Sequence, residues 1–119
     1  YGRNFGESWQ QLTTLRLGGR NFLRGELTFL GNFESLEELD LSSNYFDGTI
    51  PAKIGRLSSL EILNLASNNF EGLPTEIQQL NSLESLNLSN NKFGDEGFVI
   101  DKVSHLKNLV SLDVSGNGL

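Results

Sequence analysis

The residue types that support catalysis are scarce in this sequence. A catalytic site needs a nucleophile with a base, two carboxylates in different environments, or a set of metal ligands. The chain contains one histidine, His105, and no cysteine. His105 occupies a variable position next to the apolar Leu106, and we interpret it as a solvated surface residue. A zinc site is not predicted, because cysteine and histidine are the usual zinc ligands.

One stretch has the spacing of a calcium-binding loop, Asp40-x-Ser42-x-Asn44-x-x-Asp47-Gly48. Such a loop works only if its oxygen atoms converge on one ion. The repeat described below assigns Asp40 and Ser42 to the face of a strand and Asn44 to the interior, so we expect no convergence. The sequence therefore predicts no metal, no cofactor and no enzymatic activity.

A pattern of leucines recurs along the chain, and such self-similarity decides the fold. Its units open at intervals of 23 to 26 residues, with Leu12, Leu36, Leu60, Leu83 and Leu109. The second unit shows the whole pattern, Leu36-x-x-Leu39-x-Leu41-x-x-Asn44-x-Phe46-x-Gly48-x-Ile50-Pro51. We predict a single domain over residues 1–119, with repeats at 12–35, 36–59, 60–82 and 83–108. Residues 109–119 form a partial repeat, and residues 1–11 are the tail of a preceding one.

This pattern resembles the plant-specific class of leucine-rich repeats over residues 12–119. Members of that family include ectodomains of receptor-like kinases and receptor-like proteins, and polygalacturonase-inhibiting proteins. The resemblance implies an α/β repeat solenoid, a right-handed superhelix. It places a parallel β-sheet on the concave face and short 3-10 or irregular segments on the convex side.

Strand alternation assigns the side chains of each unit to two faces. In the second unit, Leu39 and Leu41 point inward, and Glu38 and Asp40 point outward. One strand cannot bury its own apolar face, so the units stack in parallel and share one core. The convex side is expected to be closed by Leu30, Ile54, Ile77 and Val103, followed by Phe33, Leu57, Leu80 and Leu106.

Two further columns of side chains are predicted to be buried. Asparagines at the turn after each strand can donate to and accept from unpaired backbone groups, forming a ladder of Asn44, Asn68, Asn91 and Asn117. Arg20 replaces this asparagine in the first unit and marks an irregular turn. The aromatic column of Phe22, Phe46, Phe70 and Phe93 occupies the position of a core leucine. In the longest unit, we expect the segment with Asp95, Glu96 and Asp101 to bulge out as a solvated loop.

The outward face of the sheet is the candidate partner-binding surface. Its first row is Thr14, Glu38, Ile62, Ser85 and Ser111, and its second row is Arg16, Asp40, Asn64, Asn87 and Asp113. A third row of small residues, Gly18, Ser42, Ala66, Ser89 and Ser115, should leave the backbone accessible. Five strands span roughly 19 Å, the length of about six residues of extended peptide. Such a face suits a protein or peptide ligand, although it could also simply point at water. Arg16 and Asp40 are expected to be cross-strand neighbours that pair.

Charge narrows the class of partner. The net charge of −6 disfavours nucleic acid, whose phosphates require clustered basic residues. The longest apolar run is Phe98-Val99-Ile100, far short of the roughly 20 residues needed to span a bilayer. We therefore predict no membrane contact by this segment. Glu37, Glu61 and Glu84 form an acidic column beside the strands, which hints at a basic partner.

Asn87-Leu88-Ser89 is an N-glycosylation sequon, and the resemblance implies that this strand position often carries glycan. The resemblance also implies an extracellular or cell-surface location. The leading hypothesis is a protein- or peptide-binding module of a cell-surface receptor-like protein. The alternatives are a secreted inhibitor of a cell-wall-degrading enzyme and a structural scaffold, whose uncapped ends would allow end-to-end self-association.

Overall fold

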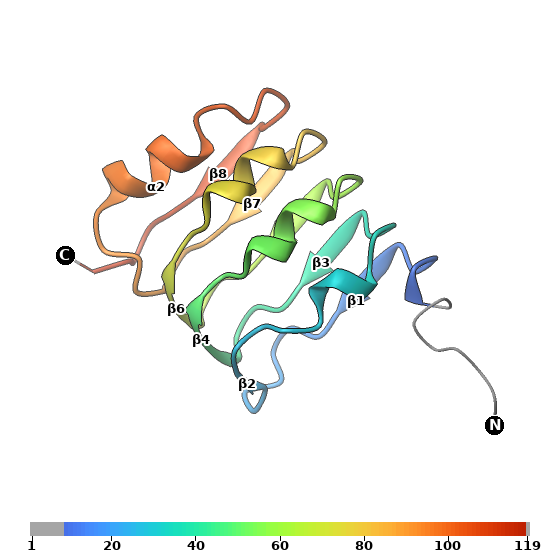
Figure 1. Cartoon of the computed structure of the whole chain (residues 1–119). Helices are drawn as coiled ribbons and strands as arrows, with labels where there is room; N and C mark the ends of the chain where they lie inside the picture. The colour runs from blue at the N-terminus through green and yellow to red at the C-terminus, as the bar shows by residue number, and fades with distance from the viewer. Residues whose placement is uncertain (1–8, 119) are drawn as a thin grey trace.

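The computed structural model describes residues 9–118, in which five short strands form one parallel sheet (Figure 1). The strands are β1 (Thr14–Arg16), β3 (Glu38–Asp40), β5 (Ile62–Asn64), β7 (Ser85–Asn87) and β8 (Ser111–Asp113). They follow one another in chain order without a shift of register. The middle residues of the three inner strands, Leu39, Leu63 and Leu86, are buried as predicted. At the two edges, Leu15 is half-buried and Leu112 is exposed.

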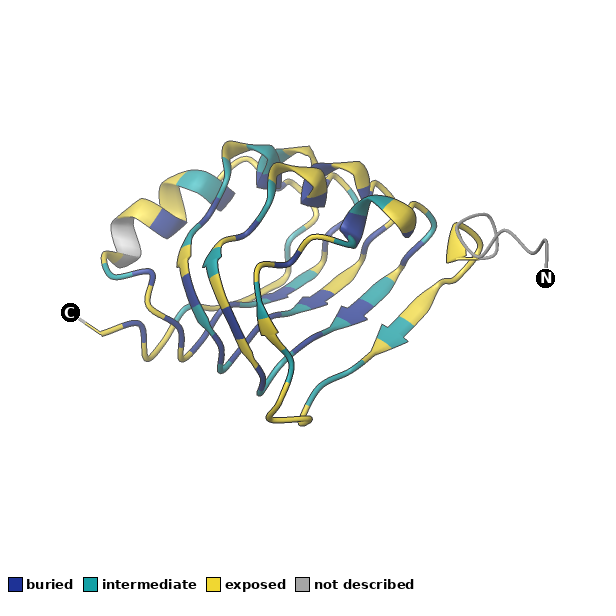
Figure 2. Ribbon diagram, turned by 60° about the horizontal axis from the view of Figure 1, so that its bottom comes forward, coloured by how far each residue is buried: buried dark blue, intermediate teal, exposed yellow. Residues whose placement is uncertain are grey.

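Short helices close the opposite side of the core (Figure 2). They are the 3-10 helices η1 (Leu30–Asn32), η2 (Ala52–Arg56) and η3 (Thr75–Gln79) and the α-helix α2 (Glu96–Val103). Pro51 and Pro74 precede η2 and η3 in an extended conformation, where the missing N–H is not needed. All eight residues expected to close this side are buried, which confirms that prediction.

The longest unit contains helix α2 where we expected a solvated loop, so that prediction was wrong. Val99 and Val103 stand four positions apart, lie on one face of the helix and are buried in the core. Phe98 and Ile100 face outward, and the Lys102 ammonium lies 5.1 Å from the centre of the Phe98 ring. The extra residues of this unit are thus absorbed by a packed helix. No helix within residues 9–118 is long and apolar enough to cross a bilayer.

A second, three-stranded parallel sheet follows the turns and was not predicted. Its strands are β2 (Arg24–Gly25), β4 (Tyr45–Thr49) and β6 (Asn69–Gly72), in that order. Alternation buries Phe46 and Phe70, whose rings stack with centroids 6.2 Å apart. Gly72 leaves room in β6 for the Thr49 side chain of β4, which a Cβ atom there would displace.

The asparagine ladder is confirmed, with all four side chains buried. Asn68 shows the geometry: its Nδ2 donates to the Leu41 carbonyl oxygen at 2.9 Å, and its Oδ1 accepts the Phe46 N–H at 3.1 Å. Asn91 makes the equivalent pair of contacts one unit later, with Leu65 and Phe70. Each amide therefore joins one coil to the preceding one.

The first turn is irregular, as Arg20 indicated, and it changes the fate of Phe22. Here the backbone N–H of Leu23 donates to Oδ1 of Asn44, the ladder asparagine of the next unit. In the other units this N–H belongs to the core phenylalanine. The turn therefore holds one additional residue, Leu23 takes the place of the core aromatic, and Phe22 is 60% exposed. The prediction that Phe22 is buried was wrong, whereas Phe46, Phe70 and Phe93 are buried as expected.

Candidate protein-binding face

The ten residues predicted for the partner-binding surface lie in two rows across the five strands. The register pairs Thr14, Glu38, Ile62, Ser85 and Ser111 in sequence, and likewise Arg16, Asp40, Asn64, Asn87 and Asp113. These residues are exposed or half-buried, and all are polar except Ile62. The Ile62 side chain is 42% exposed at the centre of the face. The structure thus brings together all ten side chains on one side of the sheet.

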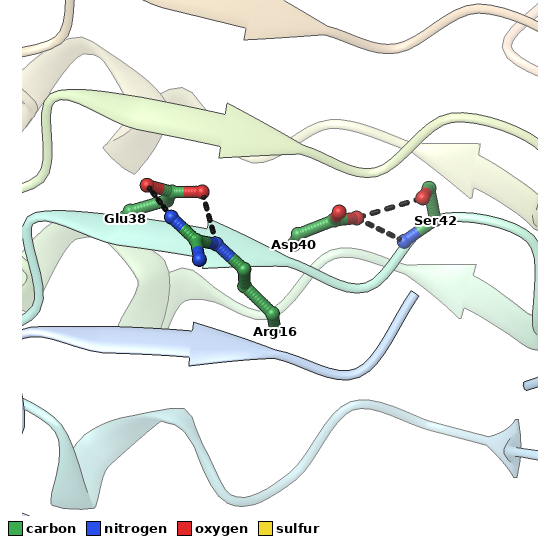
Figure 3. A network of polar contacts seen from close by, with 4 residues as sticks. All are labelled: Arg16, Glu38, Asp40 and Ser42. Carbon is green, nitrogen blue, oxygen red and sulfur yellow. Dashed lines mark hydrogen bonds and ion pairs between the residues drawn. The ribbon is translucent and has the colours of Figure 1, made fainter. Parts of the chain in front are cut away.

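Side chains of the second row are engaged with the turn that follows each strand. The Asp40 Oδ1 accepts the Ser42 N–H at 2.9 Å and the Ser42 hydroxyl at 2.7 Å (Figure 3). Asn87 makes the same two contacts with Ser89. The remaining members of this motif are Asn64 with Ala66 and Asp113 with Ser115. These four residues therefore stabilise the backbone of the strand ends, a role that the sequence analysis did not assign to them.

The third row gives less backbone access than we predicted. Ala66 and Ser89 are buried, so the expectation was wrong at these two positions. At Gly18, an added Cβ would lie 2.8 Å from Asp40 Oδ1 and 2.8 Å from Ser42 Oγ. The reason is that second-row side chains fold over the small residues beside them.

Arg16 pairs with Glu38, and the predicted pairing with Asp40 was wrong. Arg16 and Asp40 are register neighbours as expected, but the guanidinium donates to Glu38 through Nε at 2.8 Å and a terminal nitrogen at 3.0 Å (Figure 3). Asp40 is held by Ser42 instead. The hydrogen bond from Arg16 holds the pKa of Glu38 below its ordinary value. The pKa of Asp113 is also lowered. The main cause is the hydrogen bond from the Ser115 hydroxyl, and the second is the hydrogen bond from the Ser115 backbone N–H.

The first row is the part of the face that remains available to a partner. Within residues 9–118, no side-chain hydrogen bond is made by Thr14, Ile62, Ser85 or Ser111. Beside this row, Glu37, Glu61 and Glu84 are exposed and lie on successive coils, each joined to the next by a backbone hydrogen bond of 2.8 Å. The first row and the acidic column together form a polar strip along the strand beginnings.

The described residues show no arrangement suited to metal binding. Among the residues whose side chains the structure describes, which leave out Glu96 and Gly97, no group of three or more histidine, cysteine or acidic residues is placed to hold an ion. Asp40 turns toward Ser42, whereas Asn44 points inward and donates to the Leu17 carbonyl oxygen at 3.0 Å. The oxygens of the calcium-like stretch are therefore directed to different places. His105 is exposed, as predicted.

Comparison with known proteins identifies the repeat. A family model described as leucine rich repeat matches residues 34–93, and a second with the same description matches residues 82–106. No curated protein sequence matches the chain.

Solved structures similar to this chain include three plant receptors. The ectodomain of the Arabidopsis thaliana receptor kinase SOBIR1 is 34% identical, with a TM-score of 0.75, over 91% of this chain and 59% of that one. The plant peptide hormone receptor RGFR1, solved in complex with RGF2, is 35% identical, with a TM-score of 0.78, over 93% and 18%. The Arabidopsis receptor kinase HAESA, solved with the peptide hormone IDA and the co-receptor SERK1, is 32% identical, with a TM-score of 0.77, over 93% and 19%.

The chain thus spans little more than half of the SOBIR1 ectodomain and about a fifth of the two longer receptors. The sequence pattern, the parallel sheet, the asparagine ladder and these matches agree. The chain belongs to the leucine-rich repeat family, and its repeats are of the kind found in plant receptor kinase ectodomains.

Proposed function

We propose that this chain is a non-enzymatic module of a cell-surface, receptor-like protein. Its partner is a protein or peptide that contacts the outward face of the five-stranded sheet. The observation that carries the proposal is the first row, where Ile62 stands exposed between Glu38, which pairs with Arg16, and Ser85, whose hydroxyl makes no side-chain hydrogen bond with the described residues. A rigid scaffold with free side chains at its surface suits recognition of another macromolecule.

The comparisons support a protein or peptide as the class of partner. HAESA and RGFR1 are each solved with a peptide ligand, and a further similar structure is that of PEPR1 with AtPEP1 at 27% identity. The acidic column of Glu37, Glu61 and Glu84 favours basic groups on the partner of this chain, through charge complementarity.

A photo-crosslinking amino acid at position 62 tests the proposal. The matched control carries the same amino acid at Ala52, which is exposed on η2 on the opposite side of the core. We expect crosslinks to one or more proteins from position 62 in the full-length protein, and none to those proteins from position 52. Crosslinks to the same proteins from position 52 alone would contradict the proposal.

We further propose that the chain is extracellular and that Asn87 carries an N-linked glycan, which would crowd the second row and leave the first row to the partner. The Asn87 Oδ1 accepts hydrogen bonds from the backbone N–H and the hydroxyl of Ser89. Its Nδ2, the atom to which glycan attaches, makes no hydrogen bond with the described residues. When the protein passes through the secretory pathway of a plant cell, we expect a glycosidase-sensitive increase in mass that Asn87→Gln abolishes. An unmodified Asn87 in the secreted protein would refute this assignment.

A further inference from the structure

The outer side of the three-stranded sheet carries a second group of exposed polar and aromatic side chains. Phe46 and Phe70 turn into the core, so the residues beside them in the strands turn outward. Arg24, Tyr45, Asp47 and Asn69 line a shallow cavity of about 300 Å³ there. These residues come from β2, β4 and β6. The three strands lie side by side along one edge of the molecule, apart from both the helices and the five-stranded sheet (Figure 1).

Two opposite charges face solvent across this cavity without neutralising each other. The register places Arg24 beside Tyr45 and Asp47 beside Asn69. Arg24 therefore lies beside Tyr45, two positions before Asp47 on the adjacent strand, and both charged residues line the cavity. Neither Arg24 nor Asp47 forms an ion pair or a side-chain hydrogen bond with another of the described side chains. Both charges of the cavity are consequently available to a partner.

Tyr45 lines the cavity, and Phe22, two positions before Arg24 in the chain, is a second exposed aromatic residue. Tyr45 is 49% exposed and Phe22 is 60% exposed. The two lie on adjacent coils, because the Tyr45 N–H donates to the carbonyl oxygen of Leu23 at 2.6 Å. The additional residue in the first turn is what moves Phe22 outward. Tyrosine and arginine are the residue types most enriched, with tryptophan, where protein interfaces derive their binding energy.

We propose that this surface, the flank site of Phe22, Arg24, Tyr45, Asp47 and Asn69, binds an extended segment of a partner protein. The segment carries an acidic side chain that pairs with Arg24 and a basic side chain that pairs with Asp47. In an extended chain, side chains two positions apart lie on one face, about 7 Å from each other, so both can point toward the cavity that Arg24 and Asp47 line. The Asn69 amide can bond to the backbone of the segment, and Tyr45 covers its apolar carbons.

A peptide titration followed by nuclear magnetic resonance tests this proposal on the isotope-labelled chain. The probe is a short capped peptide with a glutamate and a lysine two positions apart. The control peptide has the same composition with the two residues three positions apart, so that they face opposite sides. We expect saturable shifts of backbone amides in β2, β4 and β6 and at least about fivefold weaker binding of the control peptide.

Paired variants locate the effect. Arg24→Gln and Asp47→Asn should each weaken binding of the probe about fivefold. Arg56→Gln on η2 and Asp101→Asn on α2 make the same chemical changes at exposed positions elsewhere and should leave binding unchanged. An otherwise unaltered spectrum of each variant shows that it is folded.

Several results would overturn the proposal. They are the absence of shifts at millimolar peptide, equal binding of both peptides, and shifts confined to β3, β5 and β7. Saturable shifts in β2, β4 and β6 caused by a neutral oligosaccharide such as cellotetraose, with none caused by the peptide, would assign the surface to carbohydrate and also refute it. Because the crosslinking experiment at position 62 probes the other sheet, the two proposals can fail independently.

Discussion

At the scale of single residues, the ladder asparagines contribute most clearly to stability. Replacing Asn68 by leucine keeps a similar volume but leaves the buried Phe46 N–H without its acceptor. We expect Asn68→Leu to lower the free energy of unfolding by about 1–3 kcal/mol, measured by urea denaturation. Asn69→Leu, at the half-buried neighbouring position, should change it by less than about 0.5 kcal/mol. Equal effects of the two substitutions would argue against the ladder.

The ion pair of Arg16 and Glu38 makes a prediction about pH. The hydrogen bond from Arg16 lowers the pKa of Glu38 in the folded state. A lowered pKa stabilises the folded state above the pKa of the unfolded chain, and this contribution is lost as the pH falls through the lower, folded-state pKa. Because both side chains are solvent-accessible, the effect on stability is small.

Arg16→Ala should therefore raise the pKa of the Glu38 carboxyl group toward its ordinary value. Nuclear magnetic resonance titration of the side-chain carbonyl carbon measures the shift. The Asp113 carboxyl group, whose pKa is lowered by Ser115, serves as an internal reference that should not move. An unchanged Glu38 titration would show that the pair does not form in solution.

The limits of sequence analysis at this scale have a physical origin. The ladder asparagines were predictable because each unit repeats the same buried amide requirement. The partner of Arg16 was not, because Glu38 and Asp40 are both carboxylates on the adjacent strand and the choice depends on competition from Ser42. The burial of Ala66 and Ser89 likewise depends on neighbouring side chains that fold over them.

At the scale of elements, helix α2 distinguishes a packed segment from a solvated one. Val99 is 1% exposed and Ile100 is 47% exposed, although they are adjacent and similar in type. Val99→Ala should lower the free energy of unfolding by about 1–3 kcal/mol, through lost contacts and an unfilled cavity. Ile100→Ala should lower it by less than about 0.5 kcal/mol. A reversed order in denaturation experiments would mean that the helix is turned the other way.

Elements that repeat in every unit were predicted, and elements that depend on local departures were not. The strands follow from the alternating leucines, and the closing side follows from residues such as Ile54 and Ile77. Within residues 12–118 an α-helix occurs in the fourth unit alone, so no internal repetition supported helix α2. The three-stranded sheet was missed because its inward phenylalanines also fit a turn. The late Gly25 indicated an extra residue in the first unit, and the hydrogen bond from Leu23 to Asn44 places it before Leu23.

At the scale of the whole molecule, the stacking of the coils produces two outward surfaces from two sheets. One is the face of the five-stranded sheet around Ile62, and the other is the flank site around Tyr45. The face of the five-stranded sheet depends on successive units remaining in one register, since a shift by a single residue would turn outward side chains into the core. This stacking is the central claim about the molecule.

Engineered disulfides test the register most directly, because the chain has no cysteine of its own. Ile62 and Ser85 are outward register partners on β5 and β7, about 4.8 Å apart between Cα atoms, a separation that a disulfide can bridge. The double variant Ile62→Cys with Ser85→Cys should oxidise to an intramolecular disulfide, seen as the mass loss of two hydrogens. Ile62→Cys with Ala52→Cys, on opposite sides of the core, should not. Failure of the first pair to close in the folded protein, or closure of both pairs alike, would contradict the stacked repeat.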